Sequence, residues 1–368
     1  MPAYAETATL VFPAVNAVAL DYLRAARSRG ERVVCAASVA NDEVAAAAGE
    51  LHRLPSIHDV DFAAMFFALV DAQSISRVLC PVSTVHAFMA RFLAQHPGLT
   101  LIGESPVQQQ IAEHRALMAR ARRLIPLVEL CADEASMLSL REVAGVLRQA
   151  SLIYGESNDD KLAAMMGIFA SAPPGDVVEI GSLMGRSAFV LLYLAWRYRI
   201  GPMLTVDPWA AIECAQRDSP EALQHVTDEW DYEVLSEGFM LNMVPLRADD
   251  HAHQRLPSEL AFAAYDRGEP ILSPLGGRID YSRRIAVIHI DGNHDYAAVH
   301  KDCTLWLRRL APGGWLILDD YVWAHGDGPR RVGDALLHDQ SGRVERAFCC
   351  GKALFVKLQE PGGSAANP

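Results

Sequence analysis

The sequence predicts an α/β protein in two parts. A smaller α/β domain precedes a Rossmann-like domain, whose mostly parallel seven-stranded sheet ends in a C-terminal antiparallel hairpin. Three observations predict this. Short β-rich runs alternate with helix-length segments along the chain. The chain has 368 residues, more than one ordinary hydrophobic core organises. All six tryptophans follow residue 195, which places a domain boundary near residue 150.

The first half contains four β-rich runs, at residues 8–14, 32–37, 77–82 and 100–103. The helix-like segments lie at 16–29, 41–50, 60–73 and 84–95, with a closing helix at 106–125. We assign residues 1–125 to a Rossmann-like α/β domain of unclear role and residues 126–150 to a helical connector. The first strand runs into Pro13 instead of a glycine loop, so phosphate binding is not indicated. A substrate-shaping, docking or dimerisation domain in a homo-oligomer is expected.

The second half, residues 151–358, predicts five parallel-type strands and a hairpin. The strands are expected at 176–180, 203–207, 243–247, 285–290 and 313–318, and the hairpin at 344–349 and 353–358. Two long inserts, residues 210–242 and 252–283, are expected to form lids or oligomer contacts. The last residues, 359–368, are expected to be a disordered tail.

Composition narrows the class of protein. The net charge of −12 argues against a nucleic-acid partner, because phosphate binding needs a basic surface. Seven cysteines without a CxxC pair indicate a reducing compartment and no zinc site. The N-terminus lacks the pattern of a signal peptide, and no uninterrupted apolar segment approaches the length of a membrane span. A cytoplasmic protein without a membrane partner is expected.

The stretch Asp176–Asp207 is the clearest ligand-binding pattern. It contains a buried strand, a tight glycine turn, a helix and a second strand that ends in an acid. Gly181 and Gly185 let a ligand approach the main chain and the start of the helix. Asp207 lies where a carboxylate can accept from ribose hydroxyls. The turn has neither the GxxxxGK[ST] of a P-loop nor the GxGxxG of a dinucleotide fold.

A second pattern, in residues 287–321, carries candidate chemistry. One apolar strand leads to Asp291 and His294, and the next ends in Asp319 and Asp320. Side chains at the carboxyl ends of strands face the ligand crevice of an open sheet, so these four should converge. Clustered carboxylates need protons or a hard divalent cation, and Mg²⁺ is the natural candidate. Such an ion would orient a substrate hydroxyl, and His294 would take its proton.

Both patterns resemble one enzyme class. Residues 179–187 have the form E-x-G-x-x-x-G-x-S, which resembles motif I of class I S-adenosylmethionine-dependent methyltransferases. D-G-x-H-x-Y at 291–296, L-x-P-G-G at 310–314 and an acidic pair before Tyr321 resemble the macrocin O-methyltransferase and cephalosporin hydroxylase-like family. The resemblance covers about residues 151–358.

This resemblance implies S-adenosyl-L-methionine as cofactor and a small-molecule hydroxyl, on a secondary metabolite or sugar, as acceptor in natural product biosynthesis. The implied cofactor-binding residues are Glu179, Gly181, Ser182, Gly185, Ser187, Asp207 for the ribose, Trp209 for adenine, and Asp249 or Asp250 for the adenine amino group. The implied Mg²⁺ ligands are Asp291, Asp319 and Asp320, with His294 as base. In some relatives the acidic pair is Glu-Asp, whereas here it is Asp-Asp. A nicotinamide-dependent oxidoreductase and a non-catalytic cofactor-binding scaffold are the alternatives.

Overall fold

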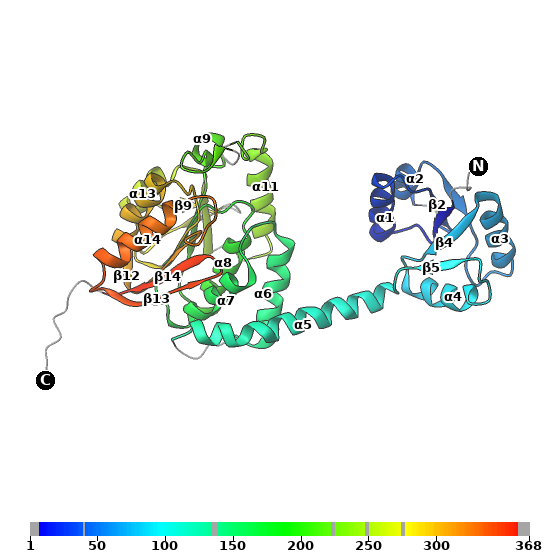
Figure 1. The fold of residues 1–368 in the computed structure, drawn as a ribbon, viewed down its shortest axis with the longest axis horizontal. Helices are drawn as coiled ribbons and strands as arrows, with labels where there is room; N and C mark the ends of the chain where they lie inside the picture. The colour runs from blue at the N-terminus through cyan, green and yellow to red at the C-terminus, as the bar shows by residue number, and fades with distance from the viewer. Residues whose placement is uncertain are drawn as a thin grey trace. The chain divides into compact units, whose positions relative to one another are not determined.

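A computed structural model describes residues 7–39, 41–133, 138–221, 225–246, 250–273 and 277–359. The chain forms two compact units that divide between Ala116 and Leu117 (Figure 1). The expected disordered tail lies outside the described residues, apart from Gln359. That residue donates its N–H to the carbonyl of Arg343 (2.8 Å).

The first unit contains a parallel five-stranded sheet in the order β3-β2-β1-β4-β5. Its strands are β1 (Ala8–Val11), β2 (Val33–Ala37), β3 (Leu51–Arg53), β4 (Ile75–Leu79) and β5 (Thr100–Ile102). Its helices are α1 (Ala17–Ser28), α2 (Asp42–Ala48), α3 (Phe62–Gln73) and α4 (Ser83–Leu93). The smaller α/β domain is therefore confirmed. The sequence did not predict β3 because its three residues, Leu-His-Arg, contain no apolar run.

The second unit contains a seven-stranded sheet in the order β13-β14-β12-β11-β6-β7-β8. The strands are β6 (Asp176–Ile180), β7 (Met203–Val206), β8 (His251–Gln254), β11 (Ile285–Ile290), β12 (Leu310–Leu318), β13 (Val344–Cys350) and β14 (Ala353–Leu358). In this sheet β14 runs opposite to the other six strands, so its pairings with β12 and β13 are antiparallel and the rest are parallel. The predicted Rossmann-like, mostly parallel sheet with a terminal hairpin is confirmed.

The prediction of a strand at residues 243–247 is wrong. That region ends helix α11 (Tyr232–Met243), which buries Phe239 and Met243 one helical turn apart. The third strand is β8, whose sequence His-Ala-His-Gln lacks the apolar residues by which a strand is found. The insert at 252–283 also holds a two-stranded ribbon, β9 (Ile271–Leu272) with β10 (Arg278–Ile279).

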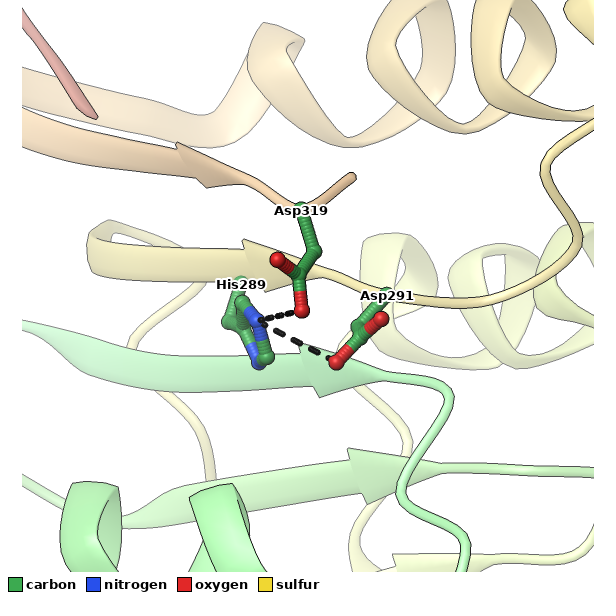
Figure 2. A group of neighbouring side chains, drawn as sticks. All are labelled: His289, Asp291 and Asp319. Atoms are coloured by element: carbon green, nitrogen blue, oxygen red, sulfur yellow. Dashed lines mark ion pairs between the residues drawn. The ribbon is translucent and has the colours of Figure 1, made fainter. Parts of the chain in front are cut away.

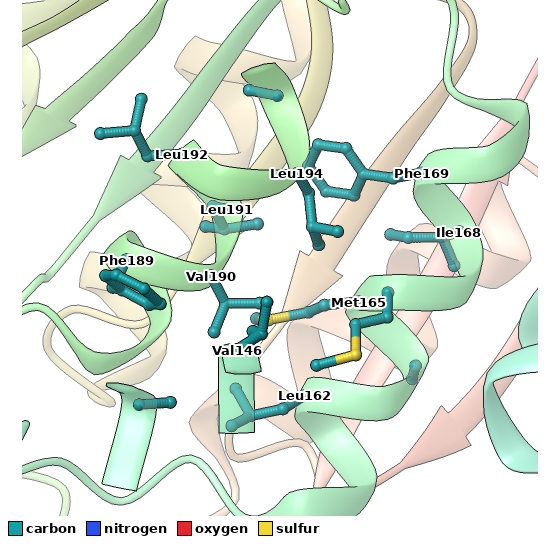
Figure 3. Packing of buried hydrophobic residues seen from close by; sticks show 14 of the residues in the cluster. Val146, Leu162, Met165, Ile168, Phe169, Phe189, Val190, Leu191, Leu192 and Leu194 are labelled. Atoms are coloured by element: carbon teal, nitrogen blue, oxygen red, sulfur yellow. The ribbon is translucent and has the colours of Figure 1, made fainter. Parts of the chain in front are cut away.

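Helices cover both faces of the larger sheet. Val177 packs with α5 to α8 on one face, and Val178, its neighbour in β6, packs with α12 to α14 on the other. The helices are α5 (Pro106–Cys131), α6 (Leu140–Leu152), α7 (Asp159–Ile168), α8 (Arg186–Tyr198), α9 (Ala211–Cys214), α12 (Ser258–Arg267), α13 (Tyr296–Trp306) and α14 (Gly328–Asp339), with 3₁₀ turns Phe169–Ser171 and Leu307–Arg309. Figure 3 shows the first face, where Met165 of α7 and Val190 of α8 meet Val146 of α6. No helix within the described ranges is long and apolar enough to cross a membrane.

The predicted connector, residues 126–150, packs into this core. Val128 of α5 and Leu147 of α6 are buried in the same cluster as Val177 of the sheet. The capping box at the start of α6, between Ser139 and Glu142, satisfies both backbone N–H groups there. These residues therefore belong to the body of the second unit.

A buried histidine in β8 makes the second unit sensitive to acid. His251 is 3% exposed, and its Nε2 lies 2.9 Å from Thr205 Oγ1. Burial lowers the pKa of His251 to about 4, so the folded protein holds the neutral ring. The unfolded chain binds a proton near pH 6.5. The stability that this histidine supports is complete above pH 6.5 and is lost as the pH falls towards 4.

We predict that the free energy of unfolding of the His251→Gln variant depends less on pH than that of the wild type between pH 7 and pH 5. Guanidinium titrations at the two pH values measure this difference. His300→Gln, which changes an exposed histidine on α13, is the control and should keep the wild-type dependence. Equal pH dependence in the wild type and the His251 variant would contradict the assignment.

Candidate active site

A cavity of about 710 Å³ opens at the carboxyl ends of β6, β7, β11 and β12. Its volume lies in the range of pockets that enclose small ligands and cofactors. The sequence-predicted residues that line it are Gly181, Ser182, Ser187, Asp207, Trp209, Asp291, His294, Asp319 and Asp320. The glycine turn and the candidate chemical groups therefore share one cavity, although about a hundred residues separate them in the chain.

Gly181 brings these two regions into contact. Its φ is +81°, and a Cβ there would lie 2.2 Å from the carbonyl oxygen of Asp291. On either side of this contact, Gly181 N–H donates to Val206 O (2.9 Å) and Asp291 N–H donates to Ile180 O (2.8 Å). Only glycine satisfies both the positive φ and the missing space. Gly185 has φ +92° and faces the Phe239 ring of α11 instead of the cavity.

Asp207 holds the shape of the turn. Its Oδ2 accepts from the backbone N–H groups of Ser182 (2.8 Å) and Leu183 (3.1 Å). Its Oδ1 accepts from the N–H of Trp209 (2.9 Å). Burial raises the pKa of Asp207, although these three hydrogen bonds oppose that shift. Since a carboxylate oxygen has two lone pairs, Oδ1 retains capacity for a ligand hydroxyl.

Two other predicted residues are almost completely buried beside the turn. Glu179 is fully buried and accepts from the Ser182 hydroxyl (2.7 Å) at Oε2. Trp209 is 2% exposed, donates from Nε1 to Leu183 O (3.0 Å) and packs against Phe239 with ring centroids 5.2 Å apart. Both residues support the turn from beneath, and Trp209 also lines the cavity.

Asp250 does not join the cavity. It precedes β8, at the amino end of that strand, and lines a separate recess with Trp196 and Pro202. The prediction that it follows a strand was wrong because the strand was misplaced, and Asp249 lies outside the described residues. Asp302 of α13 lines the main cavity instead. It is 5% exposed, its Oδ1 has no hydrogen-bond partner among the described residues, and burial raises its pKa to about 6.

Lys161 links two of the predicted metal ligands. It lies in the first turn of α7, and its side chain is 1% exposed. Its Nζ lies 3.2 Å from Asp291 Oδ2 and donates to Asp319 Oδ2. Burial opposes the charge on Lys161, but the two carboxylates outweigh it and raise the lysine pKa. Burial likewise opposes ionisation of Asp319, but Lys161 holds the pKa of that carboxyl well below its usual range.

The same network continues below the cavity through His289. Figure 2 shows the ring of His289, on β11, directed at the carboxylates of Asp291 and Asp319. Its Nε2 lies 3.6 Å from Asp291 Oδ2 and 3.8 Å from Asp319 Oδ2. Its Nδ1 lies 2.9 Å from Glu179 Oε1. A fully buried polar layer therefore joins the support of the glycine turn to the candidate chemical groups.

His294 and Asp320 form a second pair on the cavity side. Asp320 has φ +49°, and its Oδ1 accepts from Lys352 Nζ (3.0 Å). Its Oδ2 lies 3.3 Å from His294 Nε2. Gln216 Nε2 donates to His294 Nδ1 (3.3 Å), which places the remaining ring proton on Nε2, towards Asp320. Burial lowers the pKa of His294, so the ring is neutral near pH 7.

The three predicted Mg²⁺ ligands do not form one free oxygen set. Among the described residues, two groups have ligand atoms within 4.8 Å of one another: His289 with Asp291 and Asp319, and His294 with Asp291 and Asp320. Each contains an imidazole nitrogen, whereas Mg²⁺ prefers oxygen ligands. The Lys161 ammonium already lies between the carboxylates of the first group. The residues present therefore do not fit an all-oxygen Mg²⁺ site.

The sequence prediction missed both lysines. Only four lysines occur in the chain, Lys161, Lys301, Lys352 and Lys357, against 29 arginines. Lys161 stands in an otherwise apolar helix face, DDKLAAMMGI, directly before the first strand of the larger sheet. A rare lysine in a buried helix was a usable signal. Lys352 belongs to the hairpin turn, and only the antiparallel pairing of β14 with β12 brings it to this edge of the sheet.

The family comparison covers the same region. Residues 178–321 match the sequence profile of a family described as a methyltransferase domain. No curated protein matches the chain. Similar solved structures include the O-methyltransferase NovP, with 13% identity over 62% of this chain and 84% of that one, at a TM-score of 0.40. The calicheamicin methyltransferase CalS11 is 12% identical over 70% and 94% (TM-score 0.39). A putative O-methyltransferase from Klebsiella pneumoniae is 14% identical over 76% and 97% (TM-score 0.32).

We predict that Gly181→Ala destabilises the second unit by about 3 kcal/mol. The cost has two sources: alanine must adopt the left-handed conformation, and its Cβ overlaps the backbone of Asp291. Gly313→Ala is the matched control. Gly313 has φ +75°, but no atom lies within 4 Å of its Cβ position, so only the conformational cost of about 1 kcal/mol remains. Denaturant titrations measure both values. Equal destabilisation by the two substitutions would show that the contact with Asp291 is unimportant.

Proposed function

We propose that the second unit transfers a methyl group from S-adenosyl-L-methionine to a hydroxyl of a small molecule, with His294 as the general base. The observation that carries this proposal is the shared cavity. Within the segment that matches a methyltransferase domain, the glycine turn and Asp207 face the same space as Asp291 and His294. The match to that domain also disfavours the nicotinamide-dependent alternative.

The turn after β6 is the proposed cofactor-binding element. Gly181 and Ser182 line the cavity, and Ser187 lies in the first turn of α8 behind them. Asp207 Oδ1 offers its free lone pair to a ribose hydroxyl, and Trp209 provides an apolar wall for adenine. Bound S-adenosylmethionine would supply an electrophilic methyl group.

His294 is placed to remove a proton from an acceptor hydroxyl. Its lone pair is on Nδ1, where a substrate hydroxyl can replace the side-chain amide of Gln216 as donor. When Nδ1 takes the proton, the carboxylate of Asp320 accepts from Nε2–H and stabilises the imidazolium. The edge contact with the Trp323 ring, at 4.6 Å between centroids, limits rotation of the imidazole.

Part of the cavity lining is aromatic or apolar. It includes Tyr154, Trp230 and Trp323, together with Val226 and Val322. Such a surface suits a hydroxylated ring or a sugar, whose apolar faces stack on aromatic side chains. We therefore propose a secondary metabolite or sugar as acceptor and retain the homo-oligomer as an expectation.

Calorimetry with S-adenosylmethionine and with S-adenosylhomocysteine tests the cofactor assignment. We predict one-to-one binding of both to the full chain, and no heat with NAD⁺ at equal concentration. A mass-shift screen of phenols and sugars with S-adenosylmethionine then identifies an acceptor that gains one methyl group. If neither S-adenosylmethionine nor S-adenosylhomocysteine binds, the proposed function is refuted.

His294→Ala is expected to lower kcat by about a hundred-fold with the acceptor found in that screen, because the general base is lost. The affinity for S-adenosylmethionine should remain unchanged, as measured by calorimetry. His300→Ala, on the exposed side of α13, controls for loss of a histidine and should retain wild-type turnover. Full turnover by the His294 variant would exclude it as the base.

A further inference from the structure

We propose that Lys161 is a built-in cation that takes the place of a divalent metal between Asp291 and Asp319, so that the site works without metal. The expected effect on turnover rests on the proposed methyl transfer. The placement of the ammonium between the two acids does not, because it depends only on residues of this chain. Lys161 acts through the two carboxylates and is a positioning residue.

The backbone of Lys161 is fixed in place. Its N–H donates to Asn158 Oδ1 (3.0 Å), the N-cap of α7. Gly351 of the β13–β14 turn packs directly on it, since a Cβ at Gly351 would lie 2.3 Å from Lys161 N. The side chain runs from this point through the protein interior to the carboxylates and is fully enclosed.

An enclosed ammonium requires a counter-charge, and the Asp319 carboxylate supplies it. An unpaired buried charge is strongly destabilising, whereas Lys161 Nζ donates to Asp319 and has Asp291 as a second hydrogen-bond partner. A Mg²⁺ ion bound to both carboxylates would need oxygen ligands at about 2.0–2.1 Å. An ion on Asp291 Oδ2 and Asp319 Oδ2 would lie beside Lys161 Nζ, and two neighbouring cations in a buried region repel strongly.

The third carboxylate is neutralised in the same way. Asp320 pairs with Lys352 Nζ at 3.0 Å on one oxygen and faces His294 on the other. Each of the three acids predicted to bind Mg²⁺ therefore has an ammonium partner from the chain itself. A lysine ammonium is compact enough to lie between two carboxylates, whereas the planar guanidinium of arginine needs a wider space. This accounts for a lysine instead of an arginine at position 161, between Asp291 and Asp319.

The first experiment uses the unmodified full chain and Mn²⁺ as probe. Electron paramagnetic resonance of Mn²⁺ titrated with the protein distinguishes bound from free ion. We expect no stoichiometric binding by the wild type. One-to-one Mn²⁺ binding by the wild type that is lost in Asp319→Asn would overturn the inference, and this comparison does not depend on any lysine variant folding.

The second experiment removes the cation and preserves the shape of the side chain. Lys161→Met should bind Mn²⁺ roughly ten-fold or more tighter than the wild type, because the carboxylates are left without a partner. Its melting temperature should rise with added Mn²⁺, and that of the wild type should not. Lys161→Met with Asp319→Asn should lose the gained binding. A folded Lys161→Met protein that gains no Mn²⁺ affinity would also overturn the inference.

Lys357→Met is the matched control. Lys357 is also a largely buried lysine between two carboxylates, 2.8 Å from Asp133 and 3.2 Å from Glu345, and it does not line the cavity. Its loss reproduces the destabilisation of a buried ion pair, but Arg346 remains to compensate Asp133. No gain in Mn²⁺ binding is expected. An equal gain in Mn²⁺ affinity in this control would show that removing any lysine from between two acids creates a Mn²⁺ site. That result would overturn the specific role of Lys161.

Turnover separates this inference from the proposed function. With an acceptor in hand, wild-type methyl transfer should be unchanged by EDTA, whereas Lys161→Met should become dependent on Mg²⁺. EDTA-sensitive turnover of the wild type, restored by Mg²⁺, would reject the built-in cation and leave methyl transfer established. Failure to bind S-adenosylmethionine would reject the methyl transfer and leave the Mn²⁺ results to decide the role of Lys161.

Discussion

The ion pairs of Lys161 with Asp291 and Asp319 join three elements of the second unit. Lys161 comes from α7, and the two acids end the neighbouring strands β11 and β12. Since all three side chains are mostly buried, the pairs are protected from water and salt, unlike pairs on the surface. The arrangement requires α7 to begin at the carboxyl edge of the sheet, and Gly351 of the hairpin closes over that start. The positions of the hairpin, of α7 and of the two acids therefore depend on one another.

A second constraint lies one strand away, where Gly181 touches the main chain of Asp291. Because the two backbones meet without a side chain between them, the glycine turn and Asp291 lie within one cavity wall. His289 and Glu179 connect the two constraints from below, with Nδ1 and Oε1 separated by 2.9 Å. A change in the charge of the acids would therefore reach the glycine turn through fully buried groups.

The sequence allowed accurate prediction of the elements with strong local signals. Strands β6 and β11 have the predicted bounds, because apolar β-branched runs between turn residues define them. Strand β8 was missed because its four residues are mostly polar, and the error carried Asp250 to the wrong edge of the sheet. The convergence of Asp291, His294 and Asp320 followed from the rule for strand ends. Lys161 could not be placed by that rule, since a helix start has no fixed register with the sheet that it covers.

The two lysines beside the acids also change how the acids should be understood. A row of aspartates at strand ends suggests a metal only while no other positive charge is known nearby, and sequence spacing does not show a partner 130 residues away in the chain. With the two lysines included, the site has two groups of charges. In the interior, the Lys161 ammonium compensates the Asp319 carboxylate. At the cavity, Lys352 pairs with Asp320, and burial keeps the neighbouring His294 ring uncharged. A neutral imidazole beside a compensated carboxylate is the state that a general base needs. Lys161 and Lys352 thus compensate the charges of the acids around His294, one from the interior and one from the partly exposed hairpin turn.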